Sequence, residues 1–211
     1  MGQSIPEILG EVADYYSEKL AQYGQDPRGV DWNSEESQWL RFQQLSKIID
    51  RSNSYSINDL GCGYGALFEF LSQSDKHFDY FGIDVSADMI DAAIKQFNGS
   101  RNAHFIVAGE PPHIADYGIA SGIFNVRQTR SDEAWQAYLE STLDRMNQSS
   151  RIGFSFNCLT RYSDPEKMRD YLYYADPSAL FDHCKRRYSR NVALLHDYEL
   201  YEFTILVRKQ S

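Results

Sequence analysis

The feature that most restricts the fold of this chain is a glycine-rich segment at residues 59–65, Asp-Leu-Gly-Cys-Gly-Tyr-Gly. The preceding residues 56–60 are typical of a short buried strand, and the apolar residues at 67, 68 and 71 predict a helix directly afterwards. Glycine permits positive φ and lets the backbone approach a ligand closely. The first turn of the helix carries unpaired N–H groups. This order predicts a ligand-binding turn in an α/β fold.

The rest of the chain continues this alternation of strands and helices. Apolar runs predict further strands, and capping residues at Ser86, Ser131 and Asp176 predict helix starts. The strands are expected at residues 79–83, 104–108, 117–121, 151–159, 192–195 and 201–208. Five residues between the last two strands cannot form a parallel crossover, so these strands form either a hairpin or an antiparallel pair separated by another strand. We therefore predict a seven-stranded, doubly wound, Rossmann-like α/β sheet with an antiparallel last strand.

Two helices are predicted before the sheet begins. The first starts near Ser4 and ends before residues 23–29, and the second starts at Asn33 or Ser34 and carries an apolar stripe to Ile49. Their amphipathic pattern indicates a cover over a ligand site. We assign residues 1–54 to an N-terminal helical cap and residues 55–211 to the ligand-binding domain, within one folding unit.

Composition narrows the possible partners. The 211 residues include 21 basic and 30 acidic side chains, which gives a net charge of −9. This balance argues against nucleic acid or an anionic membrane surface as the main partner. Three separated cysteines indicate neither a disulfide framework nor a metal site. With no signal-peptide pattern and no long apolar stretch, a cytoplasmic location is expected.

An acidic residue beyond the second predicted strand indicates the kind of ligand. Asp84 lies 19 residues after Gly65, where a carboxylate can accept hydrogen bonds from both hydroxyls of a ribose. Gly61, Gly63 and Ala66 also satisfy the dinucleotide pattern G-x-G-x-x-G/A, so a nicotinamide dinucleotide is one candidate.

Other features favour S-adenosylmethionine over a dinucleotide. Asp59 precedes the first glycine by two residues and would lie unfavourably beside a pyrophosphate, whereas it suits a ligand with ammonium and sulfonium charges. Gly65 completes a D-x-G-x-G-x-G run. The short terminal strand pair is also unlike the second parallel half of a dehydrogenase.

On these residues the chain resembles the class I S-adenosylmethionine-dependent methyltransferases. The resemblance covers residues 56–209 and is most specific at 58–65 and 80–89. It implies a seven-stranded α/β fold with S-adenosylmethionine as cofactor. It also implies that the methionine end of the cofactor lies against Asp59, Gly61 and Gly63, the ribose against Asp84, and the adenine against Val85 and Met89. The methyl group would lie at the end of the fourth strand, beside Ser121 and Gly122.

Two further residues are candidate cofactor contacts. Glu110, after the third strand, resembles the acid with which the family recognises adenine, although aspartate is more usual there. The next residue is Pro111, which has no N–H to donate to the adenine. Arg41 lies in the second N-terminal helix and could pair with the cofactor carboxylate. The alternative is that Arg41 is a surface residue near Glu36 or Asp50.

Candidate substrate contacts follow the fourth and fifth strands. Asn125 and Arg127 come directly after the fourth strand, at the sheet edge that binds ligands in such folds. Residues 160–176 are rich in tyrosine and basic side chains, which suits either a substrate lid or an amphipathic connector. Within that segment we select Tyr171 and Tyr173 as substrate candidates.

The resemblance implies transfer of a methyl group from S-adenosylmethionine, and we expect a small-molecule acceptor. No [DNS]-P-P-[YFW] tetrapeptide follows the fourth strand, and no cysteine follows a proline, so nucleic-acid methylation is not expected. His113 and His196 are possible bases, but the sequence identifies no catalytic residue. The alternatives are an NAD-dependent oxidoreductase and a non-catalytic S-adenosylmethionine-binding protein.

Overall fold

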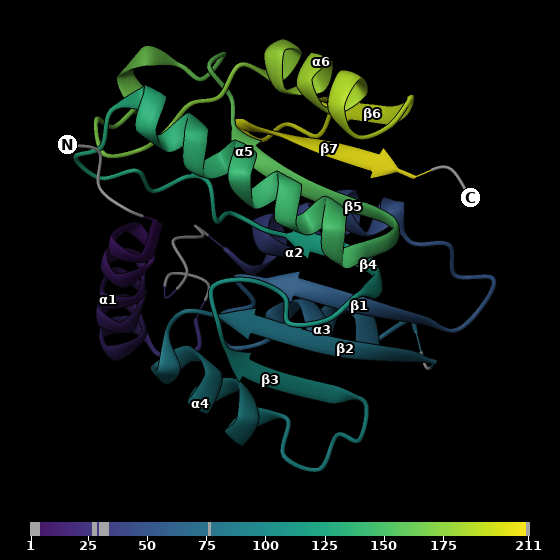
Figure 1. The fold of residues 1–211 in the computed structure, drawn as a ribbon. Helices are drawn as coiled ribbons and strands as arrows, with labels where there is room; N and C mark the ends of the chain where they lie inside the picture. Colours follow the sequence, from purple (N-terminus) through teal and green to yellow (C-terminus); the bar gives the residue numbers. More distant parts are fainter. Residues whose placement is uncertain (1–4, 27–28, 30–33, 76, 210–211) are drawn as a thin grey trace.

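The protein forms a seven-stranded sheet with helices on both faces, as seen in a computed structural model (Figure 1). The structure describes residues 5–26, 29, 34–75 and 77–209. The strand order is β3-β2-β1-β4-β5-β7-β6, with β7 antiparallel to both of its neighbours. The predicted fold class is therefore confirmed, including the antiparallel last strand. Of the two arrangements left open for the last two strands, the hairpin is the one observed.

The strands lie within one or two residues of their predicted positions. Their bounds are Tyr55–Leu60 (β1), Phe78–Asp84 (β2), Ala103–Val107 (β3), Ala115–Ala120 (β4), Ser150–Leu159 (β5), Asn191–Leu195 (β6) and Glu202–Arg208 (β7). β1 pairs in parallel with β2 on one side and with β4 on the other. The carboxyl ends of these central strands therefore meet at one edge of the sheet.

The helices begin at the capping residues that the sequence indicates. Side chains of Ser34, Ser86, Ser131 and Asp176 accept hydrogen bonds from the first turns of α2, α4, α5 and α6. The predicted start at Ser4 and the alternative cap Asn33 lie outside the described residues. The helix bounds are Ile5–Tyr23 (α1), Glu35–Leu45 (α2), Ala66–Ser72 (α3), Ala87–Gln96 (α4), Asp132–Ser149 (α5) and Pro177–Arg187 (α6), with short 3-10 turns at Ser46–Ile48 (η2) and Pro165–Lys167 (η3).

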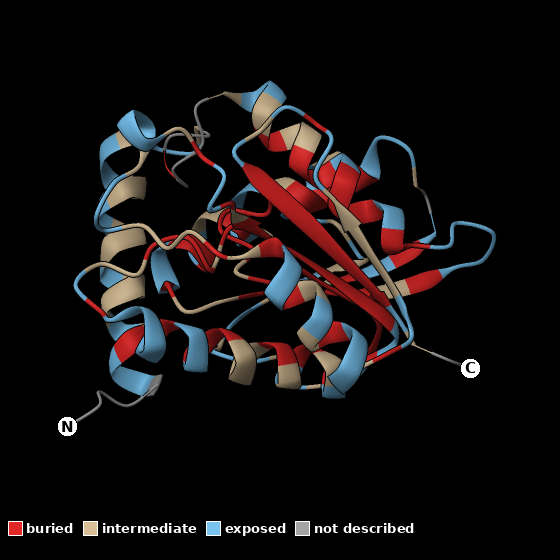
Figure 2. Cartoon of the chain, turned by 90° about the horizontal axis from the view of Figure 1, so that it is seen from above, coloured by how far each residue is buried: buried red, intermediate tan, exposed pale blue. Residues whose placement is uncertain are grey.

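Two apolar clusters, one on each face, hold the helices on the sheet (Figure 2). One joins α5 and α6 to the sheet and includes Trp135, whose indole N–H donates to the Phe124 carbonyl at 2.8 Å. The other joins α2 and α3 to the opposite face and includes Leu45 and Leu71, which have no exposed surface. Because Leu45 belongs to this cluster, α2 packs into the core and α1 alone stands at the sheet edge (Figure 1).

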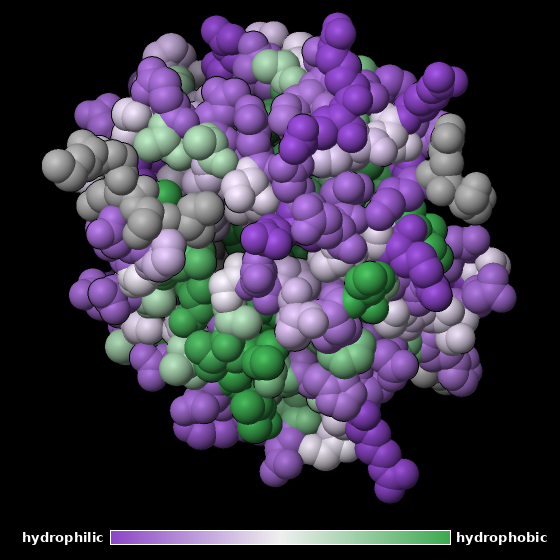
Figure 3. Space-filling model, viewed as in Figure 1, coloured by the Kyte–Doolittle hydropathy of each residue, from purple (hydrophilic) through white to green (hydrophobic). Residues whose placement is uncertain are grey.

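The connection between β3 and β4 is unusually short. Residues 108–114 cross β2 and β1 without a helix, whereas parallel crossovers usually need a dozen or more residues and a helix. Ile106 and Ile114 consequently stay 44% and 69% exposed. Apolar side chains gather on the surface in the region of β3 and α4 (Figure 3). Across the described ranges, none of the helices is both long and apolar enough to span a bilayer.

The position of α2 gives a stability prediction. Replacing Leu45 by alanine removes a fully buried side chain and leaves a cavity between α2 and the sheet. We expect the free energy of unfolding to fall by about 2–5 kcal/mol in urea titrations. The same truncation at Ile94, which is 49% exposed on α4, should change it by less than about 1 kcal/mol. A loss at Leu45 no larger than that at Ile94 would contradict the packing of α2 into the core.

Candidate functional site

The glycine-rich turn is held against the end of β2. The N–H groups of Gly61 and Cys62 both donate to the Ile83 carbonyl, at 2.7 and 3.1 Å. Gly61, Gly63 and Gly65 have φ values of +77°, +53° and +89°. A side chain at these positions would strain the backbone, so the turn depends on glycine for its conformation.

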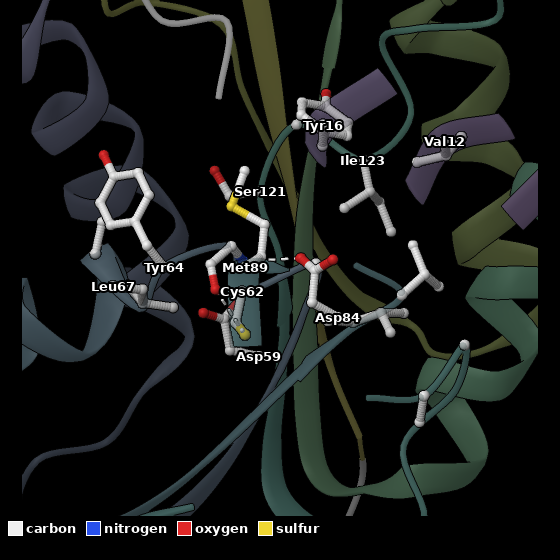
Figure 4. Close-up of a pocket in the computed structure, with 18 of the residues that line it drawn as sticks. Val12, Tyr16, Asp59, Cys62, Tyr64, Leu67, Asp84, Met89, Ser121 and Ile123 are labelled. Carbon is white, nitrogen blue, oxygen red and sulfur yellow. Dashed lines mark hydrogen bonds between the residues drawn. The ribbon is translucent and has the colours of Figure 1, made fainter. Parts of the chain in front are cut away.

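Asp84 joins this turn to the start of the next helix. One carboxylate oxygen accepts the Gly63 N–H at 2.9 Å (Figure 4). The other accepts the Ser86 N–H at 2.9 Å. Burial raises the pKa of Asp84, while these backbone donors lower it in part. Each oxygen keeps a second lone pair, so the carboxylate can still accept hydrogen bonds from ligand hydroxyls.

A second carboxylate lies deeper in the same site. Asp59, at the end of β1, is buried and accepts a hydrogen bond of 2.5 Å from the Tyr80 hydroxyl. Burial raises the pKa of Asp59 to about 7. The hydrogen bond from Tyr80 lowers this pKa, and the neighbouring charge of Asp84 raises it further. The site therefore carries a carboxyl group that changes charge near neutral pH.

These groups line one pocket at the carboxyl ends of β1, β2 and β4 (Figure 4). Eight of the ten predicted cofactor contacts lie on its wall: Asp59, Gly61, Gly63, Asp84, Val85, Met89, Ser121 and Gly122. Among the described residues that line the pocket, Asp59 and Asp84 are the only acidic ones, and none is Lys, Arg or His. The pocket therefore favours a ligand that carries positive charge over one that carries a pyrophosphate.

Helix α1 supplies a wall that the sequence did not resolve residue by residue. Leu9, Val12 and Tyr16 line the pocket. Two contacts hold the helix in place. The Ser17 and Ser86 hydroxyls share a hydrogen bond of 2.9 Å. Glu11 pairs with Arg130. An amphipathic stripe indicates that a helix packs on something, but not which of its residues face a ligand.

Other lining residues that we did not predict come from distant elements. Gln38 and Phe42 belong to α2, Tyr138 belongs to α5, and Ile123 follows β4. No local motif marks these positions, because only the packing of the helices on the sheet brings them to the pocket.

The two remaining predicted cofactor contacts lie outside the pocket lining. Arg41 pairs with neither Glu36 nor Asp50 but with Glu202 at the start of β7, at 2.8 Å from Nη2 to Oε1. Glu110 forms an exposed ion pair with Arg145 at 3.1 Å. In each case an opposite charge from a distant part of the chain holds the side chain, which sequence spacing cannot reveal. Cofactor binding by these two residues stays a prediction.

The predicted substrate residues also lie outside this lining. The side-chain oxygen of Asn125 accepts the Leu159 N–H at 3.2 Å, and the backbone carbonyl of Asn125 accepts the Tyr173 N–H at 2.8 Å. Arg127 donates to the Leu172 carbonyl at 3.2 Å. Tyr171 is 47% exposed. The structure thus brings the two segments together as neighbours, an arrangement that fits the connector interpretation, and substrate binding by these residues remains untested.

The possible bases lie elsewhere too. His113 lies in the β3–β4 connection and packs edge-on against Phe81 of β2, with ring centroids 4.1 Å apart. Burial and the nearby His104 lower its pKa. His196 lies between the rings of Tyr162 and Phe203. Neither histidine lines the pocket.

Three features of the pocket wall bear on its fit to S-adenosylmethionine. A Cβ at Gly109 would lie 2.6 Å from Leu9 Cδ1, so a side chain there would displace the end of Leu9 from the pocket wall. The Ser121 hydroxyl is buried and has no hydrogen-bond partner among the described residues. Two carboxylates, the Ser121 hydroxyl and apolar side chains around Met89 together match a cationic nucleoside whose aromatic base has apolar ring faces.

Comparisons with known proteins identify methyltransferases as relatives of this chain. Residues 57–148 match the family model described as "Methyltransferase domain". The chain is 61% identical over 165 residues to "Putative methyltransferase Rv1506c" of Mycobacterium tuberculosis H37Rv, a match that covers 78% of this chain and 99% of that protein.

Solved structures share the fold. Human N-acetylserotonin methyltransferase in complex with S-adenosylmethionine superposes with a TM-score of 0.69 at 14% identity, covering 100% of this chain and 61% of the human chain. Magnesium protoporphyrin IX methyltransferase from Synechocystis PCC 6803, with bound S-adenosylmethionine, gives 0.62 at 12% identity, covering 95% of this chain and 96% of the other. The chain therefore belongs to the class I S-adenosylmethionine-dependent methyltransferases, as its sequence motifs predict.

The contact between Gly61 and Ile123 gives a test of the turn. A Cβ at Gly61 would lie 2.1 Å from Ile123 Cγ2, so Gly61→Ala adds a steric clash to the strain of a positive φ. Gly99 also has a positive φ, of +96°, but a Cβ there meets nothing within 4 Å. We expect Gly99→Ala to cost about 1 kcal/mol of unfolding free energy and Gly61→Ala to cost at least twice as much in urea titrations. Equal losses would mean that the clash is relieved without cost.

Proposed function

We propose that this protein transfers the methyl group of S-adenosylmethionine to a small-molecule acceptor. The observation that carries this proposal is the pocket with two acidic side chains and no basic one among its described lining residues. When bound, the cofactor supplies an electrophilic methyl group on a sulfonium, which is already a good leaving group. The protein is then needed mainly to position the acceptor and to exclude water.

The lining residues divide the pocket by chemistry. Asp84 suits the ribose hydroxyls, because its oxygens keep free lone pairs at the end of β2. Val85 and Met89 supply apolar surface for the adenine, and Leu9 of α1 lies close to Val85 beside Gly109. Asp59 and the glycine turn remain for the charged methionine end.

A small acceptor is favoured by the way α1 lies across the pocket. Its contacts with Ser86 and Arg130 hold Leu9, Val12 and Tyr16 at the pocket wall. The aromatic and amide groups of Tyr16, Gln38 and Tyr138 suit a flat, uncharged or cationic molecule. The net charge of −9 argues in the same direction against a nucleic acid.

Calorimetry and a transfer assay test the proposal together. We expect the protein to bind S-adenosylmethionine and S-adenosylhomocysteine but not NAD. Labelled methyl groups should appear in the small-molecule fraction of a cell extract and not in its RNA, DNA or protein fractions. NAD binding alone would indicate an oxidoreductase, binding without transfer would indicate a non-catalytic protein, and label in a macromolecular fraction would overturn the small-molecule assignment.

Asp84 gives a quantitative prediction. In Asp84→Ala the ligand loses hydrogen bonds to a charged acceptor, and the Gly63 N–H loses its partner. We expect the affinity for S-adenosylmethionine to fall by about 2 kcal/mol or more, roughly 30-fold, in calorimetric titrations. Asp88→Ala, which removes an exposed carboxylate from the first turn of α4, serves as the control and should change this affinity less than about threefold. Near-normal binding by Asp84→Ala would exclude the ribose assignment.

Asp59 predicts a pH dependence of cofactor binding. Its pKa of about 7 means that the carboxyl group loses its proton as pH rises through neutrality, and the ionised form attracts a cationic ligand. The affinity for S-adenosylmethionine should therefore rise between pH 6 and 8, in calorimetry at constant ionic strength. Tyr80→Phe removes the hydrogen bond that stabilises the carboxylate, so it should shift the midpoint to higher pH. If the midpoint does not move in this variant, ionisation of Asp59 is not the cause of the pH dependence.

A further inference from the structure

A buried chain of polar groups runs from α2 to the edge of the pocket. The Arg41 guanidinium contacts both oxygens of Glu202, with its Nε 2.9 Å from each. Glu202 Oε2 accepts from Asn157 Nδ2 at 2.6 Å. Asn157 Oδ1 in turn accepts the Gly122 N–H at 2.7 Å. The side chains of Glu202 and Asn157 are 1% and 0% exposed, so water does not compete for these bonds.

The charge of Arg41 and Glu202 fixes the direction of every bond in this chain. A guanidinium only donates hydrogen bonds, and a carboxylate only accepts them. The NH₂ group of Asn157 must therefore face Glu202, which leaves its oxygen to face the Gly122 N–H. Without the charge pair, the side-chain amide of Asn157 could rotate by half a turn. Its NH₂ group would then face the Gly122 N–H, and two donors would meet without an acceptor.

The far end of the chain belongs to the pocket. Gly122 lines it with a φ of +79°, and the Gly122 carbonyl accepts the Asn125 N–H at 3.3 Å. Its neighbour Ile123 lies against the glycine turn, so close that Gly61 has no room for a Cβ. A shift at Gly122 would therefore move both Ile123 and the adjoining wall of the pocket.

Stability alone does not explain this arrangement. Removing a buried ion pair in favour of well-packed apolar side chains often leaves stability unchanged or raises it, because burying two charges costs desolvation energy. What the charged pair supplies here is direction, because it specifies one orientation of the Asn157 amide. A defined orientation is of use at Gly122, where the amide meets the pocket.

We propose that Glu202 and Asn157, with Arg41, are positioning residues that fix the Gly122 N–H and thereby the pocket wall at residues 121–123. This inference rests on the proposed function in so far as that wall contacts the cofactor. It assigns Arg41 a role different from the direct cofactor contact that the sequence suggested. None of the three residues lines the pocket, so each acts through Gly122.

Exchanging the polar groups between two positions tests the proposal. In E202Q the new amide directs its oxygen to Arg41 and its NH₂ to the NH₂ of Asn157, so one bond in the chain is lost. In N157D two carboxylates face each other. In the double variant N157D/E202Q every donor meets an acceptor again: the NH₂ at position 202 faces a carboxylate at position 157, whose other oxygen accepts the Gly122 N–H.

Two measurements report the result. Hydrogen exchange of the Gly122 amide, followed by NMR of ¹⁵N-glycine-labelled protein without cofactor, reads the bond directly. Calorimetry with S-adenosylmethionine reads the pocket wall. D116N is the matched control, because Asp116 also accepts a backbone N–H, from Ser56 at 2.9 Å, and pairs with Arg151, but lies near the opposite end of β4.

We expect both single variants to raise the exchange rate at Gly122 at least tenfold and to weaken cofactor binding about tenfold, while N157D/E202Q restores both within about threefold. D116N should lower the unfolding midpoint and change neither. Unaltered exchange in E202Q, failure of the double variant to restore it, or equal loss of binding in D116N would each overturn the proposal.

Two further outcomes remain decisive. If the single variants do not fold, exchange at Gly122 in N157D/E202Q still decides, because a wild-type rate supports the chain of bonds and a faster rate contradicts it. If the wild-type protein binds no S-adenosylmethionine, the proposed function fails, while the exchange measurement without cofactor still tests the positioning of Gly122.

Discussion

The site depends on one hydrogen bond, which the Gly63 N–H donates to the Asp84 carboxylate. It ties the turn after β1 to the end of β2, and its second oxygen ties the same point to the start of α4 through Ser86. Three elements that are separate in sequence thus meet at one carboxylate. Because the turn passes through positive φ values, it has no repeating backbone hydrogen bonds of its own and needs such an external acceptor.

The buried carboxyl group of Asp59 lowers the stability of the folded protein when it ionises without a cation nearby. Burial raises the pKa of Asp59 to about 7, whereas its unfolded value lies near 4. Between these values the folded protein holds a proton that the unfolded chain releases, so this group makes the unfolding free energy fall as pH rises from 4 to 7. A bound cation favours the ionised form and offsets that cost, which links cofactor binding to the stability of β1 and its turn.

Sequence reasoning recovered the parts of this molecule that depend on local patterns. The strands, the caps at Ser86 and Ser131, and the glycine turn all follow from residues close together in the chain. Arg41 and Glu110 were harder to interpret, because their partners Glu202 and Arg145 are distant in sequence and no spacing rule connects them. The pocket wall from α1 was foreseen as a helix but not as individual residues.

The turns after β1 and β4, which form the two lips of the pocket, are held by the same kind of hydrogen bond. The turn after β1 has its Gly63 N–H bound by Asp84 of the neighbouring strand β2, and the turn after β4 has its Gly122 N–H bound by Asn157 of the neighbouring strand β5. In both cases a glycine with positive φ leaves the sheet and a side-chain oxygen from the next strand replaces the lost ladder bond. Asp84 makes its bond with an acidic side chain, whereas the amide of Asn157 needs the charge pair of Glu202 and Arg41 behind it to define its orientation. The acidic lip suits the charged and hydroxylated parts of a cofactor. The neutral lip adds no charge at the end of β4, where the proposed function would place the methyl group.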